Sequence, residues 1–311
     1  MSSIPLVEVR RGGRVECVHR GWFVVTDAQG NLLKASGALP AVFARSSAKP
    51  FQALQIVDSG VADALALTRA ELAVCASSHA GSPTHVAAVE RILDKAGVPA
   101  TALRCGAHPP LGEPAAPAGV LQNNCSGKHA GMLAVCRRRG WALDGYLEAD
   151  HPLQQAIQAR FSDLAGTLMS GATDGCGVPA WHLPLEGLAT AFARLPGDPA
   201  GRRILDAMRA EPAMVAGSGR RDTLLMEATG GRLVSKGGAE GVSAGCDPDR
   251  GIGWAIKIAD GASRAVGPAL VAMLRGCDLI TGAEAALLEA VARPEIRNHA
   301  GTLVGNLEAV D

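Results

Sequence analysis

Strand-like sequence lies at both ends of this chain and helix-like sequence fills its middle, and this order constrains the fold most. Residues 5–36 contain the apolar runs Val-x-Cys-Val and Trp-Phe-Val-Val, followed by a polar turn at 27–31, which is typical of a hairpin. Residues 232–260 read as a short strand followed by a second hairpin, whereas residues 46–229 carry helical periodicity. We therefore predict an α+β fold, in which one antiparallel sheet built from N- and C-terminal segments is covered by a helical cluster.

Composition and charge exclude several classes of protein. The 311 residues are 48% hydrophobic and 19% charged, and 30 basic side chains balance 30 acidic ones. Such a balance gives no broad field that would attract nucleic acid or an anionic membrane, and no apolar run approaches the length of a membrane span. We find no internal repeat and no linker, so we expect a single domain over residues 1–311.

The first residues and the cysteines bear on the compartment. The N-terminal segment lacks the apolar core of a signal peptide, so we expect a cytoplasmic protein. The eight cysteines are scattered along the chain, which favours reduced thiols or metal ligands over a disulfide framework.

Several helix boundaries can be predicted from local signals. Thr68 and Glu71 have the spacing of a capping box, and a second helix is expected from Ser82 to a stop at Gly97. The last part of the chain, from residue 266 to 291, is expected to be helical.

A serine and a lysine are one helical turn apart in residues 45–50, Arg-Ser-Ser-Ala-Lys-Pro. A helix that begins near Ser46 would place Ser46 and Lys49 on one face, with the amine within reach of the hydroxyl. Lysine can take the proton of a serine only when desolvation or nearby positive charge lowers its pKa. The alternative is a serine N-cap followed by a surface lysine, and Pro50 fits only the first turn of a helix. The motif therefore needs partners elsewhere in the chain.

Four other polar clusters are candidates for such partners. Residues 77–79, Ser-Ser-His, lie in a tight connection between two expected helices. Residues 123–129 open another helix, whose positive dipole end would favour a thiolate at Cys125. Residues 173–179 form a glycine-punctuated turn that holds an acid and a thiol, and residues 236–241 begin with Lys-Gly-Gly at a strand end.

The order of a Ser-x-x-Lys helix, a serine turn and a Lys-Gly-Gly strand is similar to that of the penicillin-recognising enzymes and the serine-dependent glutaminases. The finer pattern resembles the class-3, rhizobial-type L-asparaginases, or asparaginase II. The motifs that carry this resemblance are Arg-Ser-Ser-Ala-Lys-Pro (45–50), Ser-Ser-His-Ala-Gly (77–81), Asn-Cys-Ser-Gly-Lys-His (124–129), Asp-Gly-Cys-Gly-Val-Pro (174–179) and Lys-Gly-Gly-Ala-Glu-Gly (236–241). The resemblance implies a homodimeric amidohydrolase that converts L-asparagine and water to L-aspartate and ammonia, with a fold like that of the serine β-lactamases and glutaminases.

Carried over residue by residue, the resemblance also implies which residues form the site. The catalytic residues would be two Ser-Lys pairs, Ser46 with Lys49 and Ser78 with Lys236, and Lys257 is a weaker candidate for the second lysine. In the scheme we expect, Ser46 attacks, Lys49 shuttles the proton, and Ser78 with Lys236 provides a second proton path. Which serine is acylated stays open.

The resemblance further implies a substrate site and a metal site. Arg45 would pair with the carboxylate of an amino-acid substrate and Asp174 with its ammonium group, and His79 belongs to the same set. A zinc ion that aids substrate binding, without being essential for the chemical step, would be held by Cys125, Lys128 and Cys176, with water as the fourth ligand.

Other functions remain open at this point. A glutaminase is the nearest rival, because one added methylene changes binding by only about 1–3 kcal/mol. A β-lactamase or peptidase is disfavoured by the missing export signal and by the absence of a Lys-Thr/Ser-Gly triplet. The asparaginases that use an N-terminal threonine are disfavoured because Thr229-Gly-Gly lies far downstream. A non-catalytic zinc-binding or amino-acid-binding protein is the alternative from another class.

Overall fold

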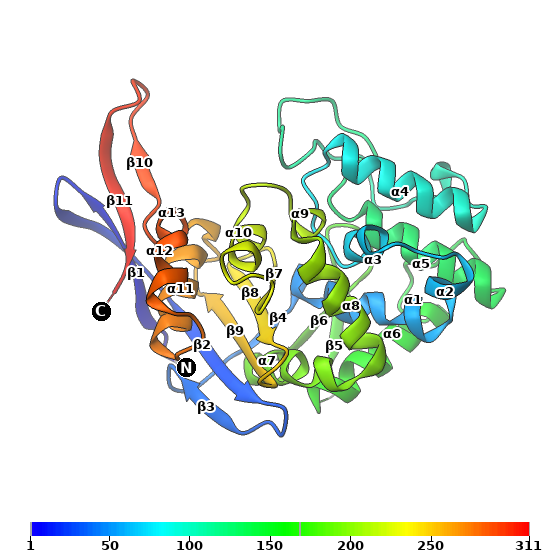
Figure 1. The fold of residues 1–311 in the computed structure, drawn as a ribbon, viewed down its shortest axis with the longest axis horizontal. Coiled ribbons are helices and arrows are strands. Elements are labelled where there is room, and N and C mark those ends of the chain that lie inside the picture. The colour runs from blue at the N-terminus through cyan, green and yellow to red at the C-terminus, as the bar shows by residue number, and fades with distance from the viewer. Residues whose placement is uncertain (1, 168, 311) are drawn as a thin grey trace.

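The centre of the molecule is a large antiparallel sheet. In this computed structural model, residues 2–167 and 169–310 are described, and the main path of the sheet has the order β10-β11-β1-β2-β9-β8-β7, with β3 paired to β2 (Figure 1). Its strands are β1 (Ile4–Arg11), β2 (Arg14–Asp27), β3 (Leu32–Ala35), β7 (Val234–Gly237), β8 (Val242–Asp247), β9 (Ile252–Ile258), β10 (Glu295–Arg297) and β11 (Leu303–Ala309).

The two ends of the chain meet in this sheet. β2 pairs with β9, in a register that runs from Gly21 opposite Ile258 to Asp27 opposite Ile252. The prediction of one antiparallel sheet built from N- and C-terminal segments is therefore confirmed. The expectation that the last part of the chain is only helical was incomplete, because β10 and β11 follow the last helix. These two strands are largely exposed or half-buried, so they carry no clear apolar alternation.

Each face of the sheet packs against a helix. Val24 and Ala255 belong to the apolar core on the side of α7 (Leu185–Arg194), whereas their neighbours Val25 and Trp254 belong to the core on the side of α11 (Val266–Gly276). This is the alternation expected of strands with both faces buried. Helix α7 lies so close that a Cβ added at Gly253 would be 2.0 Å from the carbonyl oxygen of Ala189.

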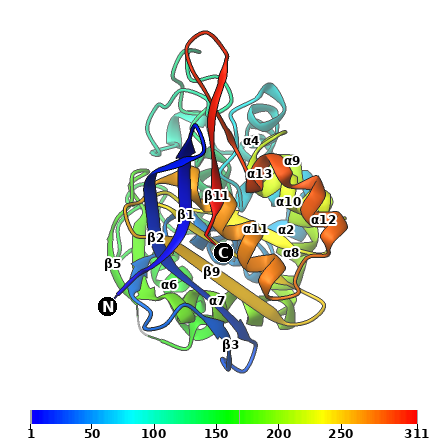
Figure 2. The same cartoon turned by 90° about the vertical axis from the view of Figure 1, so that its left-hand side faces the viewer.

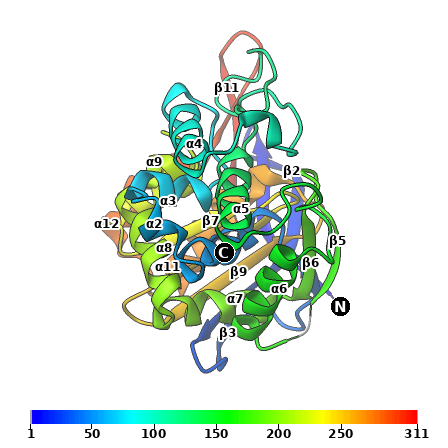
Figure 3. The same cartoon turned by 90° about the vertical axis from the view of Figure 1, so that its right-hand side faces the viewer.

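A helical cluster lies beside the sheet, on the right in Figure 1 and facing the viewer in Figure 3. The capping box at Thr68 and Glu71 is present, and Gly97 ends the helix predicted from Ser82. No helix among the described residues has the length and apolar character needed to cross a membrane. The helices between the two parts of the sheet, besides α7, are α1 (Lys49–Asp58), α2 (Val61–Ala64), α3 (Arg69–Cys75), α4 (Pro83–Ala96), α5 (Ser126–Arg139), α6 (Pro152–Ala165), α8 (Pro199–Ala210), α9 (Pro212–Val215) and α10 (Arg221–Ala228).

The segment around Ser46 differs from the expected α-helix. Residues Arg45–Ala48 form a 3₁₀ turn, η1, and α1 begins only at Lys49. The reason is Pro50, which has no N–H and therefore occupies the first turn of α1. A second, small sheet was also not predicted, since its strands are short; it has the order β4-β6-β5 and consists of β4 (Ala41–Phe43), β6 (Pro179–Pro184) and β5 (Ser170–Thr173).

Between β9 and β10, two short helices follow α11 and pack against it, on the side that faces the viewer in Figure 2. They are α12 (Gly282–Leu287) and α13 (Glu289–Ala292), and the remaining 3₁₀ turns are η2 (Ala100–Ala102), η3 (Leu195–Gly197) and η4 (Ser263–Ala265).

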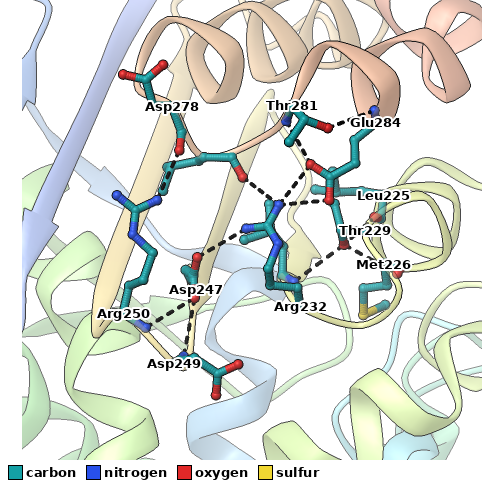
Figure 4. Close-up of polar contacts among 12 residues, drawn as sticks. Leu225, Met226, Thr229, Arg232, Asp247, Asp249, Arg250, Asp278, Thr281 and Glu284 are labelled. Carbon is teal, nitrogen blue, oxygen red and sulfur yellow. Dashed lines mark hydrogen bonds and ion pairs between the residues drawn. The ribbon is translucent and has the colours of Figure 1, made fainter.

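One arginine connects the start of β7 to β8 and α12 (Figure 4). Arg232 Nη1 lies 3.2 Å from the Asp247 carboxylate, and Nη2 lies 2.9 Å from both carboxylate oxygens of Glu284. Nη2 also donates to the Leu279 carbonyl oxygen at 3.0 Å. Asp247 is 0% exposed, so without Arg232 its charge would be buried with no cation beside it. This network fixes the start of β7, the strand that carries Lys236.

We expect Arg232→Met to lower the free energy of unfolding by about 3 kcal/mol, because a buried carboxylate would lose its partner. The matched control is Arg297→Met, which removes an ion pair with Glu295 in which both side chains are half exposed and which should cost less than about 1 kcal/mol. Chemical denaturation of both variants measures the difference. Equal losses would show that Arg232 has no special structural role.

Candidate active site

A cavity of about 520 Å³ lies where the C-terminal end of β7 meets η1 and the start of α10. Its lining includes two hydroxyl groups, from Ser46 and Ser78, and the amine-bearing Lys236. Asn124 and the arginines at positions 220 and 221 also line it. The cavity thus joins segments from the N-terminal, middle and C-terminal parts of the chain.

Two buried lysine amines meet on one serine hydroxyl in this cavity. Lys49 Nζ lies 3.0 Å from Ser78 Oγ, and Lys236 Nζ lies 2.8 Å from the same oxygen. Both lysines are 1% exposed. Lys49 is the first residue of α1, Ser78 lies in the connection between α3 and α4, and Lys236 lies on β7. Three separate elements therefore converge on Ser78.

The other contacts of the two amines differ in a way that bears on their protonation. Lys49 Nζ also lies near two oxygens of Asn124, the carbonyl O at 3.2 Å and Oδ1 at 3.5 Å, so it has three acceptors for three N–H bonds. Lys236 Nζ donates to the Gly237 carbonyl oxygen at 2.7 Å, and the Ser78 hydroxyl is its one other hydrogen-bond partner among the described residues. These contacts fit a charged Lys49 and a neutral Lys236 that accepts the hydroxyl proton of Ser78.

The electrostatic environment favours the same assignment. Burial, assisted by the positive charge of Lys49, lowers the pKa of Lys236 to about 7. Burial also lowers the pKa of Lys49, but the nearby Cys125 opposes this effect. An amine with a pKa near 7 is neutral in a large fraction of molecules near neutral pH, which is what a general base requires.

Two side chains that we did not single out in the sequence hold the end of β7 in place. Ser47 Oγ donates to the Lys236 carbonyl oxygen at 2.8 Å, from η1. Asp222 accepts from the Gly237 N–H at 2.7 Å and from the Ser235 hydroxyl at 3.1 Å. An aspartate in the first turn of a predicted helix was the available signal, but only the fold shows that it reaches β7.

Next to the cavity, two thiols and a third lysine form a buried cluster. Lys128 Nζ donates to Cys176 Sγ at 3.0 Å, and Cys125 Sγ lies 3.2 Å from Oδ1 of Asn124, a cavity residue. A hydrogen bond from Cys176 is the main cause that lowers the pKa of Cys125 well below its usual value, against the effect of burial. The same bond, together with burial, raises the pKa of Cys176. The cluster therefore favours one thiolate beside a lysine ammonium.

A comparison with known protein families identifies the chain at the level of its family. The sequence model of the family described as L-asparaginase II matches residues 7–309. The chain belongs to the L-asparaginase II family. None of the curated protein sequences compared with the chain matches it. Membership of the L-asparaginase II family supports an amidohydrolase and a small-molecule substrate.

In this L-asparaginase II family member, the two serines have different surroundings. Ser46 is half-buried and lines the cavity, but within the described residues its hydroxyl has no hydrogen-bond partner. The predicted contact between Ser46 and Lys49 is therefore absent, because the amine of Lys49 lies against Ser78 and Asn124 instead. Arg45, the residue before Ser46, has φ +48°, a conformation that is uncommon for a side chain of this size.

The three residues predicted to bind substrate lie near the site but not in the cavity lining. Arg45 Nε donates to Asp174 Oδ1 at 2.9 Å, so the two form an ion pair with each other. His79 is 0% exposed, its Nδ1 accepts from the Gly81 N–H, and its Nε2 lies 2.9 Å from Ser126 Oγ. The prediction that His79 contacts substrate does not fit this geometry, because both ring nitrogens are already bonded. A role in holding the serine connection fits better.

The three predicted metal ligands do come together in the structure of this L-asparaginase II family member. Two sulfurs and one lysine amine, from Cys125, Cys176 and Lys128, share one buried cluster. No group of three or more His, Cys, Asp or Glu side chains that could hold a metal occurs in residues 2–167 and 169–310. The cluster of Cys125, Cys176 and Lys128 differs from such a group because its third donor is a lysine amine. An amine binds a metal only after it has lost a proton.

We expect ammonia release to rise with pH through about 7, because Lys236 can act as a base only when it is neutral and its pKa lies near that value. Lys236→Ala should remove this rising limb and most of the rate. The control is Lys257→Ala: Lys257 Nζ binds the carbonyl oxygens of Glu240 and Ile258, outside the cavity lining. The rate of ammonia release, measured from pH 5 to 9 for the wild type, Lys236→Ala and Lys257→Ala, tests this prediction. A larger loss in Lys257→Ala would assign the second lysine to that position.

Proposed function

We propose that the chain hydrolyses the side-chain amide of L-asparagine, yielding L-aspartate and ammonia. The observation that carries this proposal is the contact of two buried amines with one hydroxyl, Ser78, in the cavity that Ser46 also lines. Amide hydrolysis needs an attacking hydroxyl, a base, and an acid for the leaving ammonia, and this set can supply all three. Family membership supports the same chemistry.

In the first half-reaction, Ser46 attacks the amide carbon. Within the part of the chain that the structure describes, its hydroxyl makes no hydrogen bond, and Ser46 lines the cavity, whereas the hydroxyl of Ser78 is engaged by both amines. The proton of Ser46 passes to Ser78 Oγ as Ser78 gives its own proton to neutral Lys236. Lys49 remains an ammonium and stabilises the negative charge that develops on the serine oxygens.

The same groups then return the proton. Lys236 ammonium gives its proton through Ser78 to the amide nitrogen, the C–N bond breaks, and ammonia leaves. The product of this first half-reaction is an aspartyl ester on Ser46. In the second half-reaction, water attacks the ester carbon while neutral Lys236 takes one proton of the water through Ser78. The bond between the acyl carbon and Ser46 Oγ then breaks, Lys236 returns the proton through Ser78 to Ser46 Oγ, and L-aspartate is released.

We also propose that Cys125, Lys128 and Cys176 hold a zinc ion. The donors fit, since two sulfurs and an amine already lie together and a water can complete a tetrahedron. When bound, zinc would supply a cation beside the cavity and so aid the binding of the carboxylate of a zwitterionic amino-acid substrate. The chemical step described above does not depend on it.

We also propose a fold relationship with the serine β-lactamases and glutaminases. It is supported by the close approach of three segments: the Ser-x-x-Lys segment, the serine connection and the Lys-Gly-Gly strand. A homodimer, which the sequence resemblance implies, stays a prediction.

An assay of ammonia release or substrate hydrolysis with asparagine, glutamine and a penicillin, each offered separately to the purified protein, distinguishes the proposed activity from its rivals. Ammonia from glutamine at an equal rate would make the chain a broader amidase, and no turnover of any of the three would leave a binding protein.

We expect Ser46→Ala and Ser78→Ala each to lower kcat by roughly a thousandfold or more, because the attacking group and the relay act as one unit. Ser162→Ala, on α6, is the control and should retain full activity. Acid quenching during turnover, followed by peptide mass spectrometry, locates the ester. An ester on Ser78 instead of Ser46 would reverse the roles that we assign.

We expect about one zinc ion per chain and its loss in Cys176→Ser, with a raised KM for asparagine and little change in the melting temperature. Zinc affinity should also fall as pH is lowered, more steeply than for two thiolates alone, because Lys128 must lose its proton to bind. Metal analysis after dialysis, circular dichroism and saturation curves test this. The control, Cys277→Ser, changes a thiol outside the cluster. A metal-free wild type with full activity and tight substrate binding would leave the cluster structural.

A further inference from the structure

Two neighbouring arginines in the cavity lining have no assigned role. Arg220 and Arg221 both line the cavity that contains Ser46, Ser78 and Lys236. The Nε–H of each is buried, and no described residue accepts a hydrogen bond from it. Buried donors in native proteins are rarely left without an acceptor, so such groups call for an explanation.

The charges around the cavity are strongly one-sided. Lys236 and Arg264 line it together with the two arginines, whereas Asp222 is the only acidic residue of its described lining. The Asp222 carboxylate is already bonded to Ser235 and Gly237, and its ion pair with Arg221 is long, at 3.7 Å. Burial lowers the pKa of Arg220, the charge of Asp222 opposes this effect, and the charge of Arg221 adds to it. One carboxylate of the described lining therefore stands beside two adjacent guanidinium groups.

Arg221 also lies next to the lysine that accepts the proton. A Cβ added at Gly237 would be 2.5 Å from Arg221 Nη2, so the guanidinium lies directly against the backbone of Gly237. The carbonyl oxygen of the same Gly237 accepts from Lys236 Nζ. An anion held by Arg221 would thus sit beside the reacting groups.

We infer that Arg220 and Arg221 form the subsite that binds the carboxylate of the substrate. Guanidinium groups match a carboxylate through paired N–H bonds, and no described side chain caps the start of α10 at Arg221. Arg264 is less available, because its Nε already donates to His19. Arg45 is likewise bonded to Asp174. The identity of the reacting group, a side-chain amide, rests on the proposed function.

The subsite can be tested by binding alone, in Ser78→Ala, with succinate and succinamide as matched probes. Succinate carries carboxylates where succinamide carries neutral amides of similar shape. We expect calorimetry to show succinate binding at least tenfold more tightly than succinamide. Arg220→Gln and Arg221→Gln should each weaken succinate binding about 10- to 100-fold, the usual effect of losing a charged hydrogen bond, and leave succinamide unchanged. The control is Arg203→Gln on α8, which removes an ion pair with Asp63 of α2 and should change neither affinity.

Kinetics on the active protein connect the subsite to turnover. Arg221→Gln should raise KM for asparagine about 10- to 100-fold with a much smaller change in kcat, and succinate should inhibit the wild type competitively. If the glutamine variants fold poorly, two other measurements test the subsite. Arg221→Lys keeps the charge but loses the paired N–H bonds, so it should also weaken succinate binding. Succinate, but not succinamide, should raise the melting temperature of the wild type.

Three outcomes would overturn the subsite: equal binding of succinate and succinamide, succinate affinity unchanged in both glutamine variants, or non-competitive inhibition by succinate. Failure of the proposed function looks different. A wild type that releases no ammonia from asparagine but binds succinate through these arginines would reject the hydrolysis and support the subsite.

Discussion

The pairing of β2 with β9 is the interaction on which the rest of the structure depends. It joins a strand that ends at Asp27 to one that begins at Ile252, so the two ends of the chain become neighbours in one sheet. β8 and β7 then extend the sheet beyond β9, which brings Lys236 to the edge where η1 and α10 meet it. Because α7 and α11 cover opposite faces, the sheet is buried on both sides and its position is rigidly defined.

Burying amines is costly, and here three lysines are almost fully buried within a small region. Lys49, Lys128 and Lys236 are between 1% and 3% exposed. The protein offsets this cost in different ways: Lys49 has oxygen acceptors, Lys128 lies beside thiols, and Lys236 can lose its proton. The three lysines therefore have different surroundings, although they carry the same side chain. The mechanism that we propose depends on this difference between Lys49 and Lys236.

Local signals predicted the helix boundaries well, and long-range contacts could be predicted only through the family resemblance. The capping box at Thr68 and the stop at Gly97 depend on a few adjacent residues, so the sequence contains all that is needed. The contact between Lys49 and Ser78 depends on how α1 lies against the next connection, and spacing suggested Ser46 instead. The arginines at 220 and 221 were missed for a similar reason, since two basic residues before a helix are ordinary until the fold places them in a cavity.

The convergence on Ser78 has a consequence for how the molecule assembles. Lys49 is 29 residues away from this serine in sequence and Lys236 is 158 residues away, so one contact closes a short loop and the other a very long one. Long loops lose more entropy on closure and slow the folding of the contacts that depend on them. The contact of Lys236 with Ser78 therefore needs β7 in its place in the sheet, whereas the contact of Lys49 with Ser78 does not cross that distance in sequence. Under the mechanism that we propose, a nascent or partly folded chain could contain the first lysine and the serine, yet it would lack the base until the native topology is complete.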